Sequence, residues 1–260
     1  MKQEQIEHIA QRLYTAMRQR QTLTPLSTEF PELTLDDAYQ ISKQFLTIRL
    51  ADGERVVGKK IGLTSKVVQD MLGVHQPDFG FLTDAMQFES GAEIPFEDSL
   101  IQAKSEGEIA FVLKQDLVGP NVTPEDVLAA TDYVSACFEI VDSRIENWQI
   151  KIQDTVADNA SCGVFVMGDK ADPNDVDFES CKMVIRNKGE VVAEGQGSAA
   201  LGSPLICVAW LANALAQYGE TLKAGEVILS GSLAAMIPCQ HDDDMQMEIE
   251  GIGQARYRFI

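Results

Sequence analysis

Apolar residues recur every three or four positions at the beginning of the chain, with polar residues between them. This spacing is that of one buried face of an amphipathic helix. A second helix is expected to begin at Thr34, whose hydroxyl can accept from the following amides, and to run to about Ala51. We therefore expect residues 1–53 to form a helical segment. The apolar positions of the first helix are Ile6, Ile9, Ala10, Leu13, Tyr14 and Met17.

From Arg55 onward the pattern changes to short β-branched runs separated by Gly, Pro and Asp. Two helices interrupt these runs, one beginning near Thr123 and one at Pro204. The expected fold class is α+β: a β-rich body of mixed sheets over residues 54–260, with the helical segment at its N-terminus. The expected strands are residues 56–63, 108–113, 135–141, 163–167, 183–186, 191–194, 226–230, 245–249 and 254–259.

Composition and charge exclude several classes of protein. The 260 residues are 45% hydrophobic and 23% charged, as in ordinary globular proteins. A formal net charge of −19 argues against binding of nucleic acid or an anionic membrane, so an anionic substrate must be held by a local cation. No apolar run reaches about 18 residues, and the polar start lacks a secretory signal, so we expect a cytoplasmic protein.

The five cysteines are scattered singly along the chain. An odd count without C-x-x-C spacing argues against a disulfide framework and against a thiolate zinc site. Most of them have apolar neighbours, so we interpret them as small buried hydrophobic residues. Their positions are 137, 162, 181, 207 and 239.

Three glutamates are candidate metal ligands. Glu106 and Glu108 enter an apolar strand two positions apart, so their side chains lie on one face and repel each other unless a cation lies between them. A solvated edge is the alternative for this pair. Glu139 is embedded in a second apolar run, where an ionised group needs a partner, either a metal or an arginine such as Arg144. Three carboxylates without His or Cys favour magnesium or manganese over zinc.

Lys60 and Asp78 are candidates for proton transfer. Strand alternation places Lys60 on the face of Gly58 and Gly62, where missing side chains leave room for a ligand. Asp78 belongs to a turn-rich segment, residues 73–80, and a turn-capping role is as good an interpretation of it as a catalytic one. Residues 154–163 are dense in hydrogen-bonding side chains and fit either a carboxylate cradle or a structural turn.

Taken together, these stretches resemble the hydratase/decarboxylase branch of the fumarylacetoacetate hydrolase family. The resemblance spans essentially the whole chain. Ala103, where relatives often have proline, and residues 241–244 depart from the family pattern, which affects only the shape of local loops. The matching segments are residues 58–65, 76–80, 106–110, 138–144, 154–161 and 229–232.

The resemblance implies a metal-dependent lyase that hydrates 2-hydroxypenta-2,4-dienoate to 4-hydroxy-2-oxopentanoate in the meta-cleavage catabolism of aromatic compounds. It implies that Mg²⁺ or Mn²⁺ is bound by the three glutamates and chelated by the 2-oxo acid substrate. It further implies that Lys60 and Asp78 transfer protons, and that Ser161, Gly231 and Ser232 help to seat the substrate.

Two alternatives stay open at this point. One is decarboxylation of 4-oxalocrotonate, because a metal-stabilised enolate serves loss of carbon dioxide as well as hydration. The other is a non-catalytic partner subunit of that decarboxylase. The resemblance also implies a homo-oligomer and an association with 4-oxalocrotonate decarboxylase.

Overall fold

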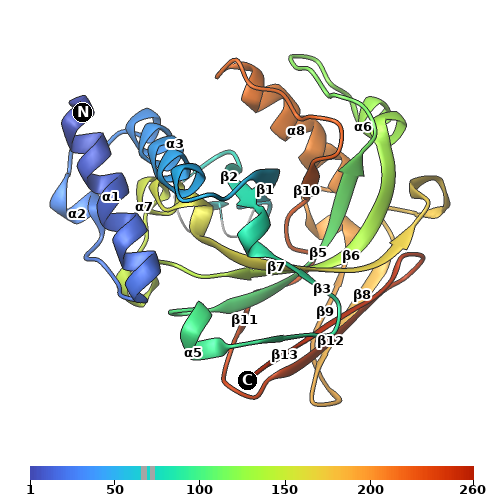
Figure 1. Cartoon of the computed structure of the whole chain (residues 1–260). Helices are drawn as coiled ribbons and strands as arrows, with labels where there is room; N and C mark the ends of the chain where they lie inside the picture. Colours follow the sequence, from blue (N-terminus) through green and yellow to red (C-terminus); the bar gives the residue numbers. More distant parts are fainter. Residues whose placement is uncertain (66–68, 71–73) are drawn as a thin grey trace.

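The N-terminal helices pack through the apolar faces that the sequence predicts (Figure 1). The computed structural model describes residues 1–65, 69–70 and 74–260, so Gly73 of the turn-rich segment lies outside the described residues. The helix α1 (Gln3–Gln19) is followed by the short α2 (Leu26–Glu29) and by α3 (Leu35–Ala51), which Thr34 caps by accepting from the Asp37 N–H at 3.1 Å. These helices share one apolar cluster with α7 (Ile152–Ala157).

Two mixed sheets form the rest of the molecule, as the fold-class prediction states. The larger has the order β2-β1-β10-β5-β6-β7-β3, with β11 paired to β5, and it curls strongly; the smaller has the order β4-β13-β12-β8-β9. The larger sheet contains β1 (Val56–Gly62), β2 (Asp78–Thr83), β3 (Gln87–Glu89), β5 (Lys104–Leu113), β6 (Thr131–Val141), β7 (Cys162–Ala171), β10 (Val227–Leu229) and β11 (Ile237–Pro238). The smaller contains β4 (Ala92–Ile94), β8 (Lys182–Asn187), β9 (Glu190–Gln196), β12 (Asp244–Ile249) and β13 (Gly253–Phe259).

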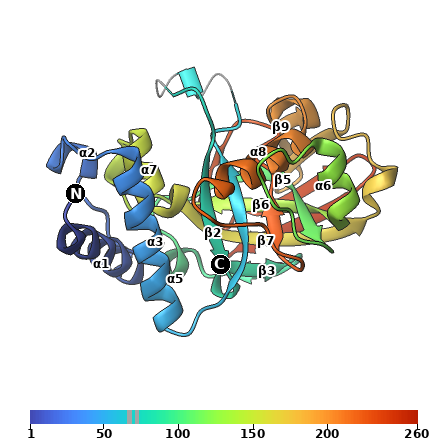
Figure 2. The same ribbon diagram turned by 90° about the horizontal axis from the view of Figure 1, so that it is seen from above.

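The remaining helices are short and lie around the sheets (Figure 2). They are α5 (Phe96–Ser99), α6 (Pro124–Ala130), α8 (Pro204–Ala216) and the 3₁₀ turns η1 (Asp84–Met86), η2 (Glu146–Trp148), η3 (Asn159–Ser161), η4 (Pro173–Asp175) and η5 (Gly197–Ala199). The division of the chain at residue 53 stays a prediction, because the N-terminal helices and α7 share one core.

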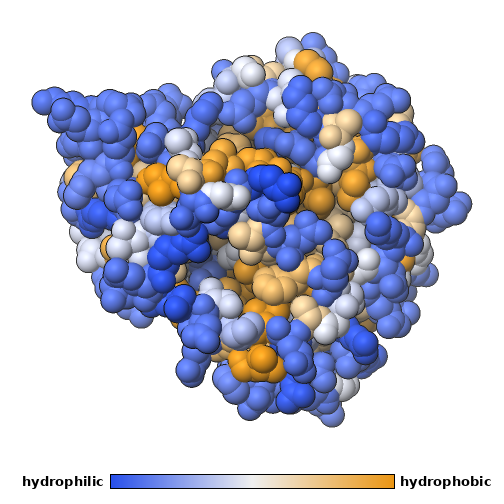
Figure 3. All heavy atoms as spheres, in the orientation of Figure 1, coloured by the Kyte–Doolittle hydropathy of each residue, from blue (hydrophilic) through white to orange (hydrophobic). Residues whose placement is uncertain are grey.

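Alternation along β5 and β6 gives the larger sheet two different faces. Ile109 and Phe138 point into the main apolar core, which fills the space between the two sheets. There the ring of Phe138 meets Tyr257 of β13 edge to face, with centroids 5.0 Å apart. Figure 3 shows that hydrophilic residues cover most of the outer surface on one side of the molecule, with apolar residues gathering near its centre.

The structure corrects the sequence analysis in two places. Asp78 does not lie in a turn, because it is the first residue of the edge strand β2. The segment that begins at residue 154 is helical at its start, because most of α7 occupies it, and only its second half forms a turn, η3. Its use as a carboxylate cradle stays a prediction. The strand β2 and the helix α7 are short, and glycine or polar residues within them obscure the spacing of their apolar residues.

Residues 197–216 are apolar and long enough to meet the length and composition criteria for a membrane span. Only Pro204–Ala216 of this stretch form α8, and at 13 residues this helix is about 20 Å long, short of the roughly 30 Å of a bilayer core. Half of the apolar window is buried inside the protein. The helix therefore packs as a core helix.

Candidate metal and proton-transfer site

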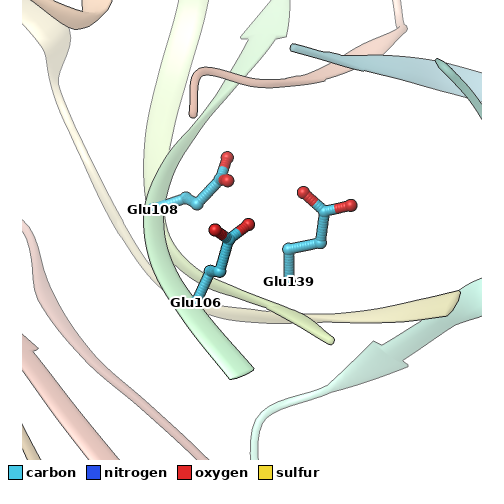
Figure 4. Close-up of side chains that lie close together, drawn as sticks. All are labelled: Glu106, Glu108 and Glu139. Atoms are coloured by element: carbon cyan, nitrogen blue, oxygen red, sulfur yellow. The ribbon is translucent and has the colours of Figure 1, made fainter. Parts of the chain in front are cut away.

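The register of β5 and β6 brings Glu106, Glu108 and Glu139 together. Glu106 lies directly opposite Glu139 in the antiparallel ladder, and Glu108 lies opposite Cys137, so all three carboxylates project from the same face. One oxygen from each lies within 4.8 Å of the others. Figure 4 shows the three side chains converging from two adjacent strands. The sequence predicted two of them on one face, and the register adds the third.

The carboxyl groups lie in an unfavourable electrostatic environment. Glu108 and Glu139 are fully buried and Glu106 is half-buried. Burial, together with the nearby Glu139 carboxylate, raises the pKa of Glu106 to about 7. The same two causes raise the pKa of Glu108 well above its ordinary range. Without a cation, this cluster therefore binds protons more tightly than isolated glutamates do.

Several of these oxygens have no hydrogen-bond partner among the described residues. They are Glu108 Oε1 and both carboxylate oxygens of Glu139, of which Oε1 has an ion pair with Lys60 at 3.2 Å in place of a hydrogen bond. Glu108 Oε2, in contrast, accepts from the Gly231 N–H at 2.8 Å. Buried oxygens without partners are costly and rare in native proteins. A cluster of convergent, unsatisfied carboxylate oxygens has the donor set that a hard divalent cation prefers.

Lys60 lies beside this cluster, and Lys59 does not. The Lys60 ammonium is buried with Nζ 3.2 Å from Glu139 Oε1, whereas Lys59 points to the other face and pairs with Glu226 at 2.8 Å. Burial by itself lowers the pKa of Lys60, but the carboxylates of Glu139 and Asp78 outweigh it and raise that pKa. Lys60 is therefore held as a cation.

Asp78 lies on the same face as Lys60. It is paired with Gly62 across β1 and β2, and a Cβ placed on Gly62 would lie 2.1 Å from Asp78 Oδ1 and 3.3 Å from Lys60 Nζ. Gly62 thus leaves the space that the Asp78 carboxylate occupies. Burial raises the pKa of Asp78 to about 6, although the Lys60 charge opposes this shift. An acid with that pKa exchanges its proton readily near neutral pH.

Arg144 is not the partner of Glu139, which decides one alternative that the sequence left open. Its guanidinium donates to Asp158 Oδ1 at 2.5 Å and to the carbonyls of Asp142, Cys162 and Asp158. Burial raises the pKa of Asp158 to about 6 despite the Arg144 charge. Among the described residues, the charged partner of Glu139 is Lys60.

Ser161 lies at the end of an unusual turn that this Arg144–Asp158 pair supports. Asn159, Ala160 and Ser161 all have left-handed backbone conformations, with φ of 55°, 51° and 53°. Such a conformation costs roughly 1–2 kcal/mol for each residue that is not glycine, so the surroundings must hold it in place. The Ser161 carbonyl accepts from the Asp142 N–H at 2.7 Å, and its hydroxyl lies 3.1 Å from Thr155 Oγ1.

Gly231 contacts the carboxylate cluster through Glu108, and Ser232 follows it in the chain. Gly231 has φ of +96°, and a Cβ there would lie 2.3 Å from Thr64 Cγ2, so glycine is required for its N–H to reach Glu108. The Ser232 hydroxyl donates to the Ala234 carbonyl at 2.7 Å. Substrate seating by Ser161, Gly231 and Ser232 stays a prediction, and the observed bonds of Gly231 and Ser232 are to the protein itself.

Sequence reasoning missed two side chains near this site. Asn159 bonds to the backbone of β2, and Tyr39 of α3 stacks on Phe79, with centroids 4.5 Å apart, next to Asp78. Tyr39 resembles any other position of an amphipathic helix, so no local signal marks it. A single asparagine in a polar stretch is equally inconspicuous.

Known proteins are similar to this chain over most or all of its length. A family model described as fumarylacetoacetate (FAA) hydrolase C-terminal matches residues 59–260. A 2-hydroxyhexa-2,4-dienoate hydratase of Comamonas testosteroni is 57% identical over 256 residues, 98% of this chain and 97% of the relative. A 2-hydroxypent-2,4-dienoate hydratase of Pseudomonas putida is 59% identical over 215 residues, 82% of this chain and 97% of the relative.

A solved structure extends the likeness to the whole fold. The 4-oxalocrotonate decarboxylase of Pseudomonas putida G7, complexed with magnesium and adipate, superposes with a TM-score of 0.97 at 37% identity, covering 100% of this chain and 99% of that one. The family match and these near-full-length relatives lead to one conclusion: the chain belongs to the fumarylacetoacetate hydrolase family.

Proposed function

We propose that this chain is a divalent-metal-dependent hydratase that converts 2-hydroxypenta-2,4-dienoate to 4-hydroxy-2-oxopentanoate. The observation that carries the proposal is the trio Glu106, Glu108 and Glu139, whose oxygens converge within 4.8 Å on one face of the sheet. The hydratases at 57% and 59% identity support the choice of reaction. We place the protein in the cytoplasm and in the meta-cleavage catabolism of aromatic compounds.

The residues present fit a divalent metal. Glu106, Glu108, Glu139 and Asp78 bring four carboxyl groups to this region, where the ammonium of Lys60 pairs with Glu139. Unsatisfied buried oxygens on Glu108 and Glu139 leave coordination positions to fill. Oxygen-only ligands select a hard ion, so we propose Mg²⁺ or Mn²⁺. When bound, the ion supplies positive charge that neutralises the glutamates and polarises the 2-oxo or enol oxygen of the substrate.

Asp78 would move the protons, with Lys60 as a fixed cation beside it. The reaction needs the enol proton to leave oxygen and a proton to reach the terminal carbon, which gives a conjugated enone, before water adds at C4 and C3 is protonated. Asp78, with a pKa near 6, is suited to accept and return a proton. Lys60 stays protonated and orients anionic groups beside Glu139. Each positioned proton transfer contributes about 10² to 10⁴ in rate.

Ser161 is the best candidate to contact the substrate carboxylate. Gly231 already donates its N–H to Glu108, and Ser232 donates its hydroxyl to Ala234. The Ser161 hydroxyl shares a bond with Thr155, from which it can turn to an incoming anion. This assignment makes a local donor, rather than the overall charge of −19, responsible for capture of the substrate.

Decarboxylation of 4-oxalocrotonate is the second candidate, favoured by the TM-score of 0.97 to a decarboxylase structure. The greater identity to hydratases makes it the weaker of the two. We also propose a homo-oligomer that associates with 4-oxalocrotonate decarboxylase, because the fold is shared over the whole chain.

The test is an assay of the purified protein against 2-hydroxypenta-2,4-dienoate with Mg²⁺, with Mn²⁺ and with a chelator. We expect metal-dependent loss of dienoate absorbance, with 4-hydroxy-2-oxopentanoate identified by NMR. Glu106→Gln should lose turnover and metal affinity together, whereas Glu248→Gln, an exposed strand glutamate on β12, should retain both. Release of carbon dioxide from 4-oxalocrotonate at a higher kcat/KM would support the second candidate. Wild-type turnover by Glu106→Gln without added metal would refute the site assignment.

A further inference from the structure

We propose that Asn159 is a positioning residue that fixes the left-handed turn bearing Ser161 against the strand that bears Asp78. The inference rests on the proposed function, because it concerns two groups that we assign to the reaction. It adds a residue that touches neither the proposed metal ligands nor the reacting atoms. The inference is based on hydrogen bonds from Asn159 to β2, which no other part of the proposed mechanism requires.

The Asn159 carboxamide bonds to the edge of β2 at two points. Its Oδ1 accepts from the Phe81 N–H at 2.7 Å, and its Nδ2 donates to the Phe81 carbonyl at 2.9 Å. These are the donor and the acceptor that a neighbouring strand would otherwise satisfy. Both bonds are buried, so losing either leaves a polar group without compensation.

The turn also lies on the face of β2 that carries the chemistry. Gly80 is on the same side of the strand as Asp78 and pairs with Lys60. A Cβ on Gly80 would lie 2.5 Å from the Asn159 carbonyl oxygen and 3.0 Å from its Oδ1. The backbone of the turn therefore fills the space above Gly80, immediately beside Asp78 and Lys60.

The far end of the turn is held by different contacts. Ser161 bonds to Asp142 and Thr155, and Arg144 donates to the Asp158 carbonyl. These contacts lie on α7 and on the segments that follow β6 and α7. The Asn159 carboxamide bonds this assembly to β2, so it helps to set how far the Ser161 hydroxyl lies from the Asp78 carboxylate.

The left-handed conformation gives this contact its importance. Asn159, Ala160 and Ser161 hold φ values between 51° and 55°. Asparagine tolerates this conformation, but Ala160 and Ser161 adopt it only where the surroundings impose it. If the clamp on Phe81 weakens, relaxation of the turn is favourable and moves Ser161. A displacement of about 1 Å in a substrate-positioning group can reduce rate by about 100-fold.

The chain offers a matched control for the experiment. Asn213 of α8 makes the same two-point contact with Val122, with Oδ1 accepting at 2.8 Å and Nδ2 donating at 2.9 Å, outside the site. Asn159→Asp and Asn213→Asp each replace one donor by an acceptor in an identical bonding pattern. Both variants should lose thermal stability, more at the buried Asn159 contact than at the partly buried Asn213 contact, while a positioning role affects kinetics in one of them alone.

We expect Asn159→Asp to lower kcat/KM for the dienoate by about 10- to 100-fold, with a raised KM and a reduced kcat, and Asn213→Asp to stay near wild type. The assays are carried out at a temperature at which circular dichroism shows that every variant is folded. Gly80→Ala, which displaces the same turn without removing a hydrogen bond, should act in the same direction and combine less than additively with Asn159→Asp. Kinetics of Asn159→Asp equal to those of Asn213→Asp would overturn the proposal.

Failure of the proposed function would show itself separately, as a wild-type protein that does not hydrate the dienoate. In that case, calorimetric binding of 2-oxopentanoate to the Mg²⁺-loaded protein replaces the rate measurement. Weaker binding by Asn159→Asp than by Asn213→Asp would still support a positioning role for Asn159. Equal affinities would refute it.

Discussion

Phe138 and Glu139 are neighbours on β6, yet they face opposite environments. Both are fully buried. Phe138 packs between the two sheets against Tyr257, in an apolar core. Glu139 projects from the other face toward Glu106, Glu108 and Lys60, with both of its carboxylate oxygens lacking a hydrogen bond.

One face of this strand pair stabilises the fold, and the other carries the proposed functional groups. Burial of apolar surface between the sheets stabilises the fold at about 25 cal/mol per Å². Clustered carboxylates on the other face oppose folding, because burial and mutual repulsion both disfavour their charged forms. The inter-sheet core thus stabilises a strand pair whose second face is arranged for binding a cation. Substitutions on the apolar face should reduce stability and leave metal binding intact. Substitutions on the carboxylate face should reduce function and leave stability intact.

The largest effect is expected from Phe138→Ala on the inter-sheet face. Removing a fully buried aromatic ring should reduce the free energy of unfolding by about 3–5 kcal/mol. The affinity of the folded fraction for Mg²⁺ should change little, because the ring points away from the carboxylates. Urea unfolding and metal titration measure the two quantities. A loss of metal affinity as large as the loss of stability would mean that the faces are not independent.

On the carboxylate face, Glu139→Gln should abolish function while sparing the fold. We expect turnover to fall by more than about 100-fold, the upper end of the loss when a group that merely supports a metal ligand is removed. Glu106 and Glu108 then lose a repelling neighbour, whereas Lys60 loses its ion-pair partner and keeps Asp78 nearby. Because these effects oppose each other, the melting temperature of the metal-free variant should stay close to that of wild type. Steady-state kinetics with Mg²⁺ and thermal unfolding with a chelator check both parts. Exposed Glu248→Gln serves as the control.

The smallest effect, and the sharpest test of electrostatics, is the pH dependence of stability in Glu106→Gln. The folded pKa of Glu106 is about 7, against an ordinary value of 4.5, so the folded state binds the extra proton between these values. The penalty for ionised Glu106 is then absent below about pH 4.5 and complete above about pH 7. In a chelator, the variant should gain melting temperature over wild type as pH rises through this window.

Added Mg²⁺ should reverse that order above pH 7, because only wild type has the full set of carboxylate ligands and binding to the folded state raises its stability. Melting temperatures of both proteins from pH 4 to pH 8, with and without the ion, measure the effect. A melting-temperature difference between the two proteins that does not vary with pH would show that the pKa of Glu106 is not raised in the folded state.

Much of the molecule is visible in local sequence. Helical spacing and the Thr34 cap predict α1 and α3, and β-branched runs predict the long strands. Two-residue alternation places Glu106 with Glu108, and Lys60 rather than Lys59 beside the glycines. These features depend on neighbours within a few positions, since side-chain direction follows directly from backbone periodicity.

Contacts between distant segments were decided only by the tertiary structure. The sequence could not show that Glu106 faces Glu139, that Arg144 turns to Asp158, or that Asn159 clamps Phe81. A shift of one residue in strand register would place Glu139 on the opposite face, and no local propensity chooses between registers. The packing of the whole chain makes that choice: the observed register buries Phe138 between the sheets while the three carboxylates converge on the other face.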